Sequence, residues 1–270
     1  MSQLATKSAT AHSITEKSLP FISDSYINCY QQEYKDDFVD KWDEIIDWKR
    51  RQESEGNFFI KTLHKYGVKR VLDVATGTGF HSIQLLNAGF DVVSVDGSAN
   101  MLTKAYKNAN QYGVQIKTAQ ADWRWLSRII HEKFDAIICL GNSFTHLFTE
   151  IDQKKSLTEF YYCLKNNGIL IIDQRNYDAI LDAGFRVTHE HYYCGKSVTI
   201  QPVYIDEHLI RFCYAFSDGS QHHLNLNPLR SCKMTELLSG AGFKYQKTYG
   251  DFKETFHCYE PDFLINIVKK

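Results

Sequence analysis

A glycine turn and an aspartate carry the clearest chemical signal in this sequence. The turn Asp73-Val-Ala-Thr-Gly77-Thr-Gly79 stands directly between a short apolar run and a segment with helical spacing. Glycines at a strand-to-helix turn let the backbone approach a ligand closely. Asp96 ends the next apolar run, and an acid at that place can accept both hydroxyls of a ribose. These features predict a nucleotide-type cofactor site, with an ordinary tight turn and a solvated aspartate as the alternative.

The spacing within the turn separates two classes of cofactor. A dinucleotide fingerprint has a third glycine three residues after the second, and Ser82 stands there instead. The D-x-x-x-G-x-G pattern suits S-adenosyl-L-methionine better, because that cofactor has no pyrophosphate to seat. Asp122 and Trp123 follow the third apolar run. The carboxylate can accept from the adenine amino group and the indole can flank the ring, although a plain core position is the alternative for Trp123.

Short apolar strands alternate with helices around these residues. The strands are expected at 71–74, 92–96, 116–119, 136–140 and 168–173. This rhythm predicts an α/β fold with a doubly wound, mostly parallel, Rossmann-like sheet, in which strands this apolar are buried on both faces. A helix over 234–241 and strands at 244–249 and 263–268 would complete a sheet of seven strands.

A second pattern interrupts the first after Asp178. Four strand-like segments follow one another without helices between them, at 189–194, 197–205, 208–216 and 220–227. They predict a small antiparallel β cap inserted into the α/β domain.

The chain is therefore expected to divide into four regions. Residues 1–24 are rich in Ser and Thr and poor in large apolar groups, which predicts a flexible tail. Residues 25–66 place aromatic groups three and four positions apart, which predicts an N-terminal helical lid. Residues 67–178 and 229–270 form the expected cofactor-binding domain, and 179–228 the expected cap over the substrate site.

Composition excludes several classes of function. Of the 270 residues, 43% are hydrophobic and 23% are charged, and the net charge of −1 argues against a chain that coats nucleic acid. No apolar run approaches the roughly 20 residues of a membrane helix. Seven scattered cysteines, none spaced C-x-x-C, predict free thiols in the cytoplasm. The pairs His189/His191 and His222/His223 lack a third ligand, so no metal site is expected.

Four strings in the chain resemble the glycine N-methyltransferase family of class I S-adenosylmethionine-dependent enzymes. They are Val71–Gly79, Ile138–Leu147, Asp173–Asp178 and Tyr249–Phe252. The similarity extends from about Tyr26 to the C-terminus and is greatest to the glycine/sarcosine N-methyltransferases of betaine synthesis. It implies methyl transfer from S-adenosyl-L-methionine to glycine, giving sarcosine, and to sarcosine, giving N,N-dimethylglycine, with S-adenosyl-L-homocysteine as the product.

The resemblance also implies roles for individual residues. Arg51 would contact the methionine carboxylate of the cofactor, Tyr34 and Trp42 would close over the sulfonium, and Asp96 would hold the ribose. The residues implied to contact the cofactor are Tyr34, Trp42, Arg51, Ala75, Gly77, Asp96, Asp122, Trp123, Leu140 and His146. The residues implied to bind the amino acid or to take part in methyl transfer are Tyr34, Asn142, Arg175, Tyr193 and Tyr214. His146 is a proton acceptor by residue type, but a structural role is favoured over a role as the base.

One departure from the family bears on the substrate. The animal enzymes are expected to carry two tyrosines before the proline that corresponds to Pro228, whereas this chain has Leu226 and Asn227. The less aromatic wall suits a second methylation. Activity on glycine alone, methylation of another small amine, and a non-catalytic cofactor-binding protein stay open as alternatives, as does assembly into a homo-oligomer.

Overall fold

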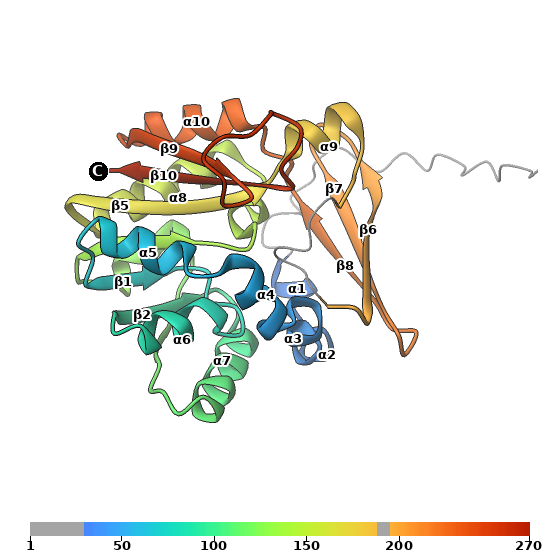
Figure 1. Cartoon of the computed structure of the whole chain (residues 1–270), viewed down its shortest axis with the longest axis horizontal. Helices are drawn as coiled ribbons and strands as arrows, with labels where there is room; N and C mark the ends of the chain where they lie inside the picture. Colours follow the sequence, from blue (N-terminus) through green and yellow to red (C-terminus); the bar gives the residue numbers. More distant parts are fainter. Residues whose placement is uncertain (1–29, 188–194) are drawn as a thin grey trace, which may run out of the picture.

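A seven-stranded sheet forms the centre of this computed structural model, which describes residues 30–187 and 195–270 (Figure 1). The strand order is β3-β2-β1-β4-β5-β10-β9. Neighbouring strands run parallel from β3 to β5, and β10 is antiparallel to both β5 and β9. The predicted doubly wound, mostly parallel sheet is therefore confirmed. Its strands are β1 (Arg70–Asp73), β2 (Asp91–Asp96), β3 (Lys117–Gln120), β4 (Phe134–Cys139), β5 (Leu164–Arg175), β9 (Lys244–Gly250) and β10 (Phe263–Lys269).

Helices cover both faces of this sheet, which explains why its central strands are apolar on both sides. One face packs against η2 (Trp123–Arg128), α8 (Glu150–Cys163) and α10 (Ser231–Gly240). The other face packs against α5 (Phe58–Lys65) and α6 (Phe80–Asn87). The helix α7 (Ala99–Gln111) lies beside β2 and β3. None of the helices in the parts of the chain that the structure describes is both long and apolar enough to span a membrane.

The chemically interesting residues meet at one edge of the sheet. Asp73 ends β1 and pairs in register with Ser94 of β2 and Ile138 of β4. Parallel strands in register bring their carboxyl ends to the same edge, where sheets of this kind bind ligands. The short helix η3 (Ser143–His146) follows β4 at this edge, and α9 (Tyr177–Ala183) follows β5.

A separate three-stranded antiparallel sheet forms the cap. Its strands are β6 (Val198–Ile205), β7 (Ile210–Phe216) and β8 (Gln221–Leu226), in the order β6-β7-β8. The hairpin between β7 and β8 turns at Gly219, whose φ of 85° suits glycine. Of the four expected strands, 189–194 lies outside the described residues. The tail expected at 1–24 also lies outside the described residues. The limits of the cap, the lid and the tail stay predictions.

Four short helices replace the continuous helical pattern expected before Glu55. They are α1 (Tyr30–Glu33), α2 (Asp36–Asp40), α3 (Trp42–Ile46) and α4 (Trp48–Glu55). Asp47, with φ at 47°, separates α3 from α4. As the N-cap of α4, its side chain accepts the Arg50 N–H at 3.3 Å. In Figure 1 these helices lie between the main sheet and the cap.

The lid is fastened to the cap by side-chain contacts. The Phe38 ring stacks on His222 at 4.6 Å and meets Tyr214 edge-on at 5.5 Å. The Glu33 carboxylate accepts hydrogen bonds from the backbone and side-chain N–H groups of Asn225. Packing across α2, α3, β7 and β8 gives this part of the molecule a hydrophobic core of its own.

Candidate active site

A cavity lies at the carboxyl edge of the sheet, beneath the lid helices. All ten residues implied to contact the cofactor line it: Tyr34, Trp42, Arg51, Ala75, Gly77, Asp96, Asp122, Trp123, Leu140 and His146. They come from the lid, from the turn after β1, and from the segments that follow β2, β3 and β4. The structure thus brings together residues far apart in the sequence, and the contact of each with the cofactor stays a prediction.

The glycine turn is held by the aspartate that precedes it. Asp73 accepts the Ala75 N–H at 3.2 Å and the Ser82 hydroxyl at 2.7 Å. Gly79 has a φ of 98°, and a Cβ there would lie 3.2 Å from the Cβ of Ala105 on α7. The serine at the third-glycine position therefore supports the turn, while Gly79 permits the helices α6 and α7 to lie close together.

Asp96 is half-buried, and its carboxylate is partly hydrogen-bonded. One carboxylate oxygen accepts the Gly77 N–H at 2.8 Å, and the other accepts the Ser98 N–H at 2.9 Å. Burial raises the pKa of Asp96 from 3.8 to about 6. Each carboxylate oxygen can accept more than one hydrogen bond, so the group retains capacity for the two ribose hydroxyls.

The two residues expected to contact the adenine, Asp122 and Trp123, bring an ion pair and an indole to the cavity. The Trp123 ring N–H donates to the Val74 carbonyl at 2.6 Å, and the ring stacks on Phe144 with centroids 6.4 Å apart. Asp122 is engaged by Arg124, whose Nε lies 2.9 Å from Oδ1 and whose Nη2 lies 2.5 Å from Oδ2. Burial raises the pKa of Asp122, but the hydrogen bonds from Arg124 outweigh it and lower the pKa overall. Asp122 is therefore an ionised acceptor at this wall.

Tyr30 and Arg124 also line the cavity and were not singled out by sequence reasoning. A Cβ on Gly97 would come 3.0 Å from the Tyr30 ring, so the lid packs directly on the residue after Asp96. The only local signal for Arg124 was its place two residues after Asp122.

Arg51, which also lines the cavity, belongs to a buried ion-pair network. Arg51 Nε lies 2.5 Å from Oε1 of Glu55, and Oε2 of Glu55 lies 3.0 Å from Nε2 of His81. Both Arg51 and Glu55 are almost fully buried. Glu55 and His81 were also missed by sequence reasoning, although a basic and an acidic residue four positions apart on a helix are a recognisable pair.

Three aromatic side chains meet where the lid crosses the cavity. The Tyr34 hydroxyl lies 2.9 Å from Nε2 of His146, and the Trp42 and Tyr34 rings meet edge-on at 5.3 Å. Burial lowers the pKa of His146 to about 4. A group with that pKa is neutral near pH 7 and is a weak base, which agrees with the structural role favoured over a proton acceptor.

Asn142 does not line this cavity, which we call the cofactor cavity after the ligand expected in it. Both of its neighbours, Gly141 and Ser143, do. Its buried side chain bonds within the protein: Oδ1 accepts the Arg175 backbone N–H at 2.9 Å, and Nδ2 donates to the Tyr177 hydroxyl at 2.8 Å. Its backbone N–H donates to Asp173 at 2.7 Å. Asn142 therefore joins the turn after β4 to the end of β5.

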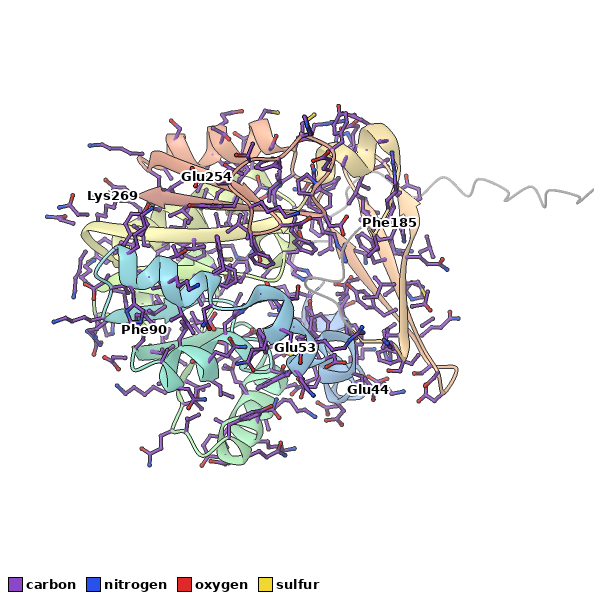
Figure 2. All side chains as sticks on the ribbon, viewed as in Figure 1. Glu44, Glu53, Phe90, Phe185, Glu254 and Lys269 are labelled. Atoms are coloured by element: carbon purple, nitrogen blue, oxygen red, sulfur yellow. The ribbon has the colours of Figure 1, made fainter. Side chains whose placement is uncertain are left out.

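Arg175 lines a second cavity, together with α9 and the loop around 250–262. Its guanidinium carbon sits 4.8 Å from the Phe212 ring centroid, 5.1 Å from that of Phe263 and 5.6 Å from that of Phe185. Figure 2 labels Phe185 on the cap side of the molecule. The structure therefore places the Arg175 guanidinium among aromatic faces and outside the lining of the cofactor cavity.

Of the two cap tyrosines implied in amine binding, Tyr193 and Tyr214, the structure describes only Tyr214. Tyr214 is buried on β7 and packs behind Trp42, with ring centroids 6.3 Å apart, without lining the cofactor cavity. Tyr193 lies outside the described residues. Asn227, at the position where the animal enzymes are expected to differ, donates its backbone N–H to the Thr145 carbonyl at 2.8 Å. It thereby ties the end of the cap to η3.

The histidine pairs do not build a metal centre in the part of the chain that the structure describes. No group of three or more His, Cys, Asp or Glu side chains able to hold a metal occurs there. His222 is used in packing on Phe38, and His189 and His191 lie outside the described residues.

Known proteins share both this fold and this sequence. Residues 71–168 match the family described as "Methyltransferase domain". Over 241 residues, the chain is 58% identical to the glycine/sarcosine N-methyltransferase of Aphanothece halophytica, covering 89% of this chain and 91% of that protein. The chain belongs to the glycine/sarcosine N-methyltransferase family. The enzyme of the same name from Halorhodospira halochloris is 56% identical over 241 residues, covering 89% and 90% of the two chains.

A solved structure supports the fold. An S-adenosylmethionine-dependent methyltransferase from Clostridium acetobutylicum superposes with a TM-score of 0.69 at 20% identity, over 90% of this chain and 99% of that one. The predicted family, the methyltransferase class and the Rossmann-like architecture are thus confirmed for this glycine/sarcosine N-methyltransferase family member.

Proposed function

We propose that the protein transfers the methyl group of S-adenosyl-L-methionine to glycine, giving sarcosine, and then to sarcosine, giving N,N-dimethylglycine. These are early steps of betaine synthesis. The observation that carries the proposal is the single cavity that gathers all ten implied cofactor residues. It occurs in a chain 58% identical to a protein named for methylation of these two amino acids.

The residues present fit this cofactor along the whole cavity. Asp96, already ordered by two backbone N–H groups, accepts the ribose hydroxyls. Trp123 presents an indole fixed by its bond to Val74, and Arg51 offers a buried guanidinium for the methionine carboxylate. When bound, the cofactor supplies an electrophilic methyl group on a sulfonium. The thioether leaves without needing a proton, so the protein acts mainly by positioning the partners and excluding water.

The amino acid must present a neutral amine to the methyl group. A carboxylate beside the amine would stabilise the ammonium form and oppose the reaction. Tyrosine hydroxyls orient an amine without that cost, and Tyr34 reaches the cavity from the lid while Tyr214 packs behind it. With a pKa near 4, His146 holds the Tyr34 hydroxyl in place rather than carrying the substrate proton.

Arg175 is proposed to hold the carboxylate of the amino acid through two parallel hydrogen bonds. Support comes from the bond that links its backbone to Asn142, whose two neighbours line the cofactor cavity. Asn142 therefore links the end of β5 that carries Arg175 to the turn that lines the cofactor cavity. The carboxylate of the amino acid is placed at Arg175 and its amine toward the methyl group of the cofactor.

The proposal is tested with purified full-length protein and S-adenosyl-L-methionine labelled in the methyl group. Glycine, sarcosine, dimethylglycine, ethanolamine and methylamine are supplied separately, a reaction without any acceptor is the control, and products are identified by mass. We expect labelled sarcosine and labelled dimethylglycine from the first two. Transfer to ethanolamine or methylamine with none to glycine would instead show a methyltransferase of another small amine.

The cytoplasm is the proposed location of the reaction. The five cysteines that the structure describes are all free thiols, including Cys232 and Cys258 at the surface. Exposed free thiols suit a reducing compartment.

A further inference from the structure

A buried acid contacts the guanidinium that faces the methionine end of the cavity. Arg51 and Glu55 lie one turn apart on α4, with Nε of Arg51 2.5 Å from Oε1 of Glu55. Their side chains are 4% and 2% exposed. An ion pair withdrawn from water this completely is costly unless its geometry is good and its other hydrogen bonds are made. Of the two side chains, Arg51 lines the cavity, whereas Glu55 does not.

A second group holds Glu55 from the other side. His81, the second residue of α6, places Nε2 3.0 Å from Oε2 of Glu55. Each oxygen of the carboxylate thus has its own partner, and the acid bridges the lid helix α4 to the helix that follows the glycine turn. The Arg51 guanidinium carbon lies over the Phe80 ring, 5.0 Å from its centroid.

We propose that Glu55, braced by His81, is a positioning residue that aims Arg51 at the α-carboxylate of the cofactor. This inference rests on the proposed function, because it takes Arg51 as the carboxylate ligand. A planar guanidinium recognises a carboxylate only in a fixed plane. The contact at Nε and the ring of Phe80 together fix that plane.

Other acids would compete for Arg51 if Glu55 were removed. Asp173 at the end of β5 is fully buried, and Arg51 is among the charges that lower its pKa against the larger raising effect of burial. Without Glu55, the guanidinium would turn toward Asp173 and away from the cofactor carboxylate. The proposal thus predicts weaker ligand binding, whereas simple relief of competition for Arg51 would predict tighter binding.

Two adenosyl ligands separate a positioning role from a general structural one. S-adenosyl-L-homocysteine carries the α-carboxylate, and 5′-methylthioadenosine lacks the amino-acid part altogether. Calorimetry on the full chain measures Kd for both ligands in the wild type and in Glu55→Gln. We expect about a tenfold weaker Kd for S-adenosyl-L-homocysteine and less than about a twofold change for 5′-methylthioadenosine. A matched control, Glu150→Gln, removes another acid four residues from a base on the exposed side of α8 and should change neither Kd.

Two further variants keep the test decisive. Glu55→Asp retains the charge but moves it by one methylene. It should weaken the binding of S-adenosyl-L-homocysteine only, and by less than Glu55→Gln does. If Glu55→Gln does not fold, Glu55→Asp replaces it in the test. In an Arg51→Lys background, Glu55→Gln should have no further effect on the ratio of the two Kd values, because the group it positions has gone.

The inference would be overturned by three results in the Glu55 variants. They are an unchanged Kd for S-adenosyl-L-homocysteine, a tighter one, and an equal loss for both ligands. Failure of the proposed function has a different signature, since it would appear as absent methyl transfer to glycine by the wild type whatever the binding data show.

Discussion

The side-chain oxygen of Asn142 accepts a hydrogen bond from the backbone N–H of Arg175 at 2.9 Å. This bond joins the turn after β4, which forms part of the cofactor cavity, to the end of β5, which carries the guanidinium of the second cavity. Asn142 can hold this place because its backbone is left-handed, with φ at 65°, a conformation that asparagine tolerates better than most residues. The two halves of the proposed site are therefore coupled through one buried amide.

Arg175→Ala is expected to abolish methylation of the amino acid while leaving cofactor affinity nearly unchanged. The reason is that Arg175 lies outside the cofactor cavity, and each hydrogen bond to a charged group contributes about 1.5–3 kcal/mol. A fall in kcat/KM for glycine of at least about a hundredfold follows from losing two such bonds. Steady-state kinetics and calorimetry with S-adenosyl-L-homocysteine measure the two quantities.

The conservative change Arg175→Lys serves as the comparison. An ammonium cannot reproduce the planar fork or its packing among Phe185, Phe212 and Phe263, so rescue should be poor. Near wild-type turnover in either variant would place the carboxylate ligand elsewhere.

Asp96→Ala is expected to weaken S-adenosyl-L-methionine binding by about tenfold to a hundredfold, the equivalent of about 1–3 kcal/mol for ribose hydroxyls left without their acceptor. The turn should persist, since Asp73 also holds it through Ala75 and Ser82. Circular dichroism checks the fold and calorimetry the affinity. Unchanged affinity in a folded variant would contradict this placement of the ribose.

The affinity for the cofactor should fall below about pH 6. Burial raises the pKa of Asp96 to about 6, so the carboxyl takes up a proton as the pH falls through that value, and the protonated form loses the charged acceptor. The slope approaches tenfold in Kd per pH unit if the carboxylate is the only binding form. Calorimetry with S-adenosyl-L-homocysteine between pH 5 and 8 follows the effect, and Asp96→Asn should give a flat profile.

Lowering the pH should weaken cofactor binding but, through the same Asp96, should increase the stability of the cofactor-free protein. The pKa of this group is higher in the folded chain than its ordinary value of 3.8, so the folded state binds the proton more tightly. Its contribution to the free energy of unfolding therefore increases as the pH falls from about 6 to about 4. Denaturation of wild type and Asp96→Asn over that range isolates the contribution, and the same pH dependence in both proteins would refute it.

Local patterns were sufficient for the sheet and for the residues at the ends of its first strands. Apolar runs and the glycine turn depend on neighbours in sequence, so strands such as β1 and β2 and the position of Asp96 at the end of β2 were predictable from the sequence. The expected strand at 168–173 is longer in the structure, where β5 begins at Leu164 and ends at Arg175. Pairing with β10 extends it to Arg175, and no local pattern reveals such pairing.

The lid and the remaining site residues depend on tertiary packing. The aromatic spacing from Tyr26 to Glu55 favours a continuous helix, but Asp47 turns the chain through a left-handed residue so that α3 packs on the cap and α4 on the cavity. Glu55 and His81, which are 26 residues apart, come together only in the folded chain, through a side-chain contact between α4 and α6. Likewise, the position of Arg175 at a strand end was readable, but its packing among three rings from separate segments was not.

Gly79→Ala should destabilise the protein more than Gly89→Ala. Both glycines have positive φ, 98° and 88°, so both variants incur the left-handed penalty of about 1–2 kcal/mol. A Cβ at Gly79 would also press on Ala105 at 3.2 Å, whereas at Gly89 nothing lies within 4 Å. We expect an additional loss of about 1 kcal/mol or more at Gly79, measured as the difference in free energy of unfolding in urea. Equal losses would mean that α6 and α7 separate without cost.

Glycine and sarcosine are both expected to be methylated, and dimethylglycine is expected to be a poor substrate. All three share the carboxylate that Arg175 is proposed to hold, so discrimination must come from the amine end. Each added methyl group fills space and removes one N–H. After deprotonation sarcosine keeps one N–H for orientation and dimethylglycine keeps none, so a pocket that hydrogen-bonds the amine disfavours the latter.

The wall of the cap bears on how many methyl groups are accepted. Leu226 is buried in the core shared by the lid and the cap, and Asn227 is tied by its backbone to Thr145 and by its side chain to the Leu147 carbonyl at 3.1 Å. Neither carries the tyrosine ring expected in the animal enzymes, and we expect the smaller side chains to allow one methyl group already present on the amine. Values of kcat/KM for the three amino acids decide the matter. Negligible turnover of sarcosine beside glycine would show a glycine-only enzyme, and efficient conversion of dimethylglycine to betaine would show that the amine is recognised by shape rather than by its N–H.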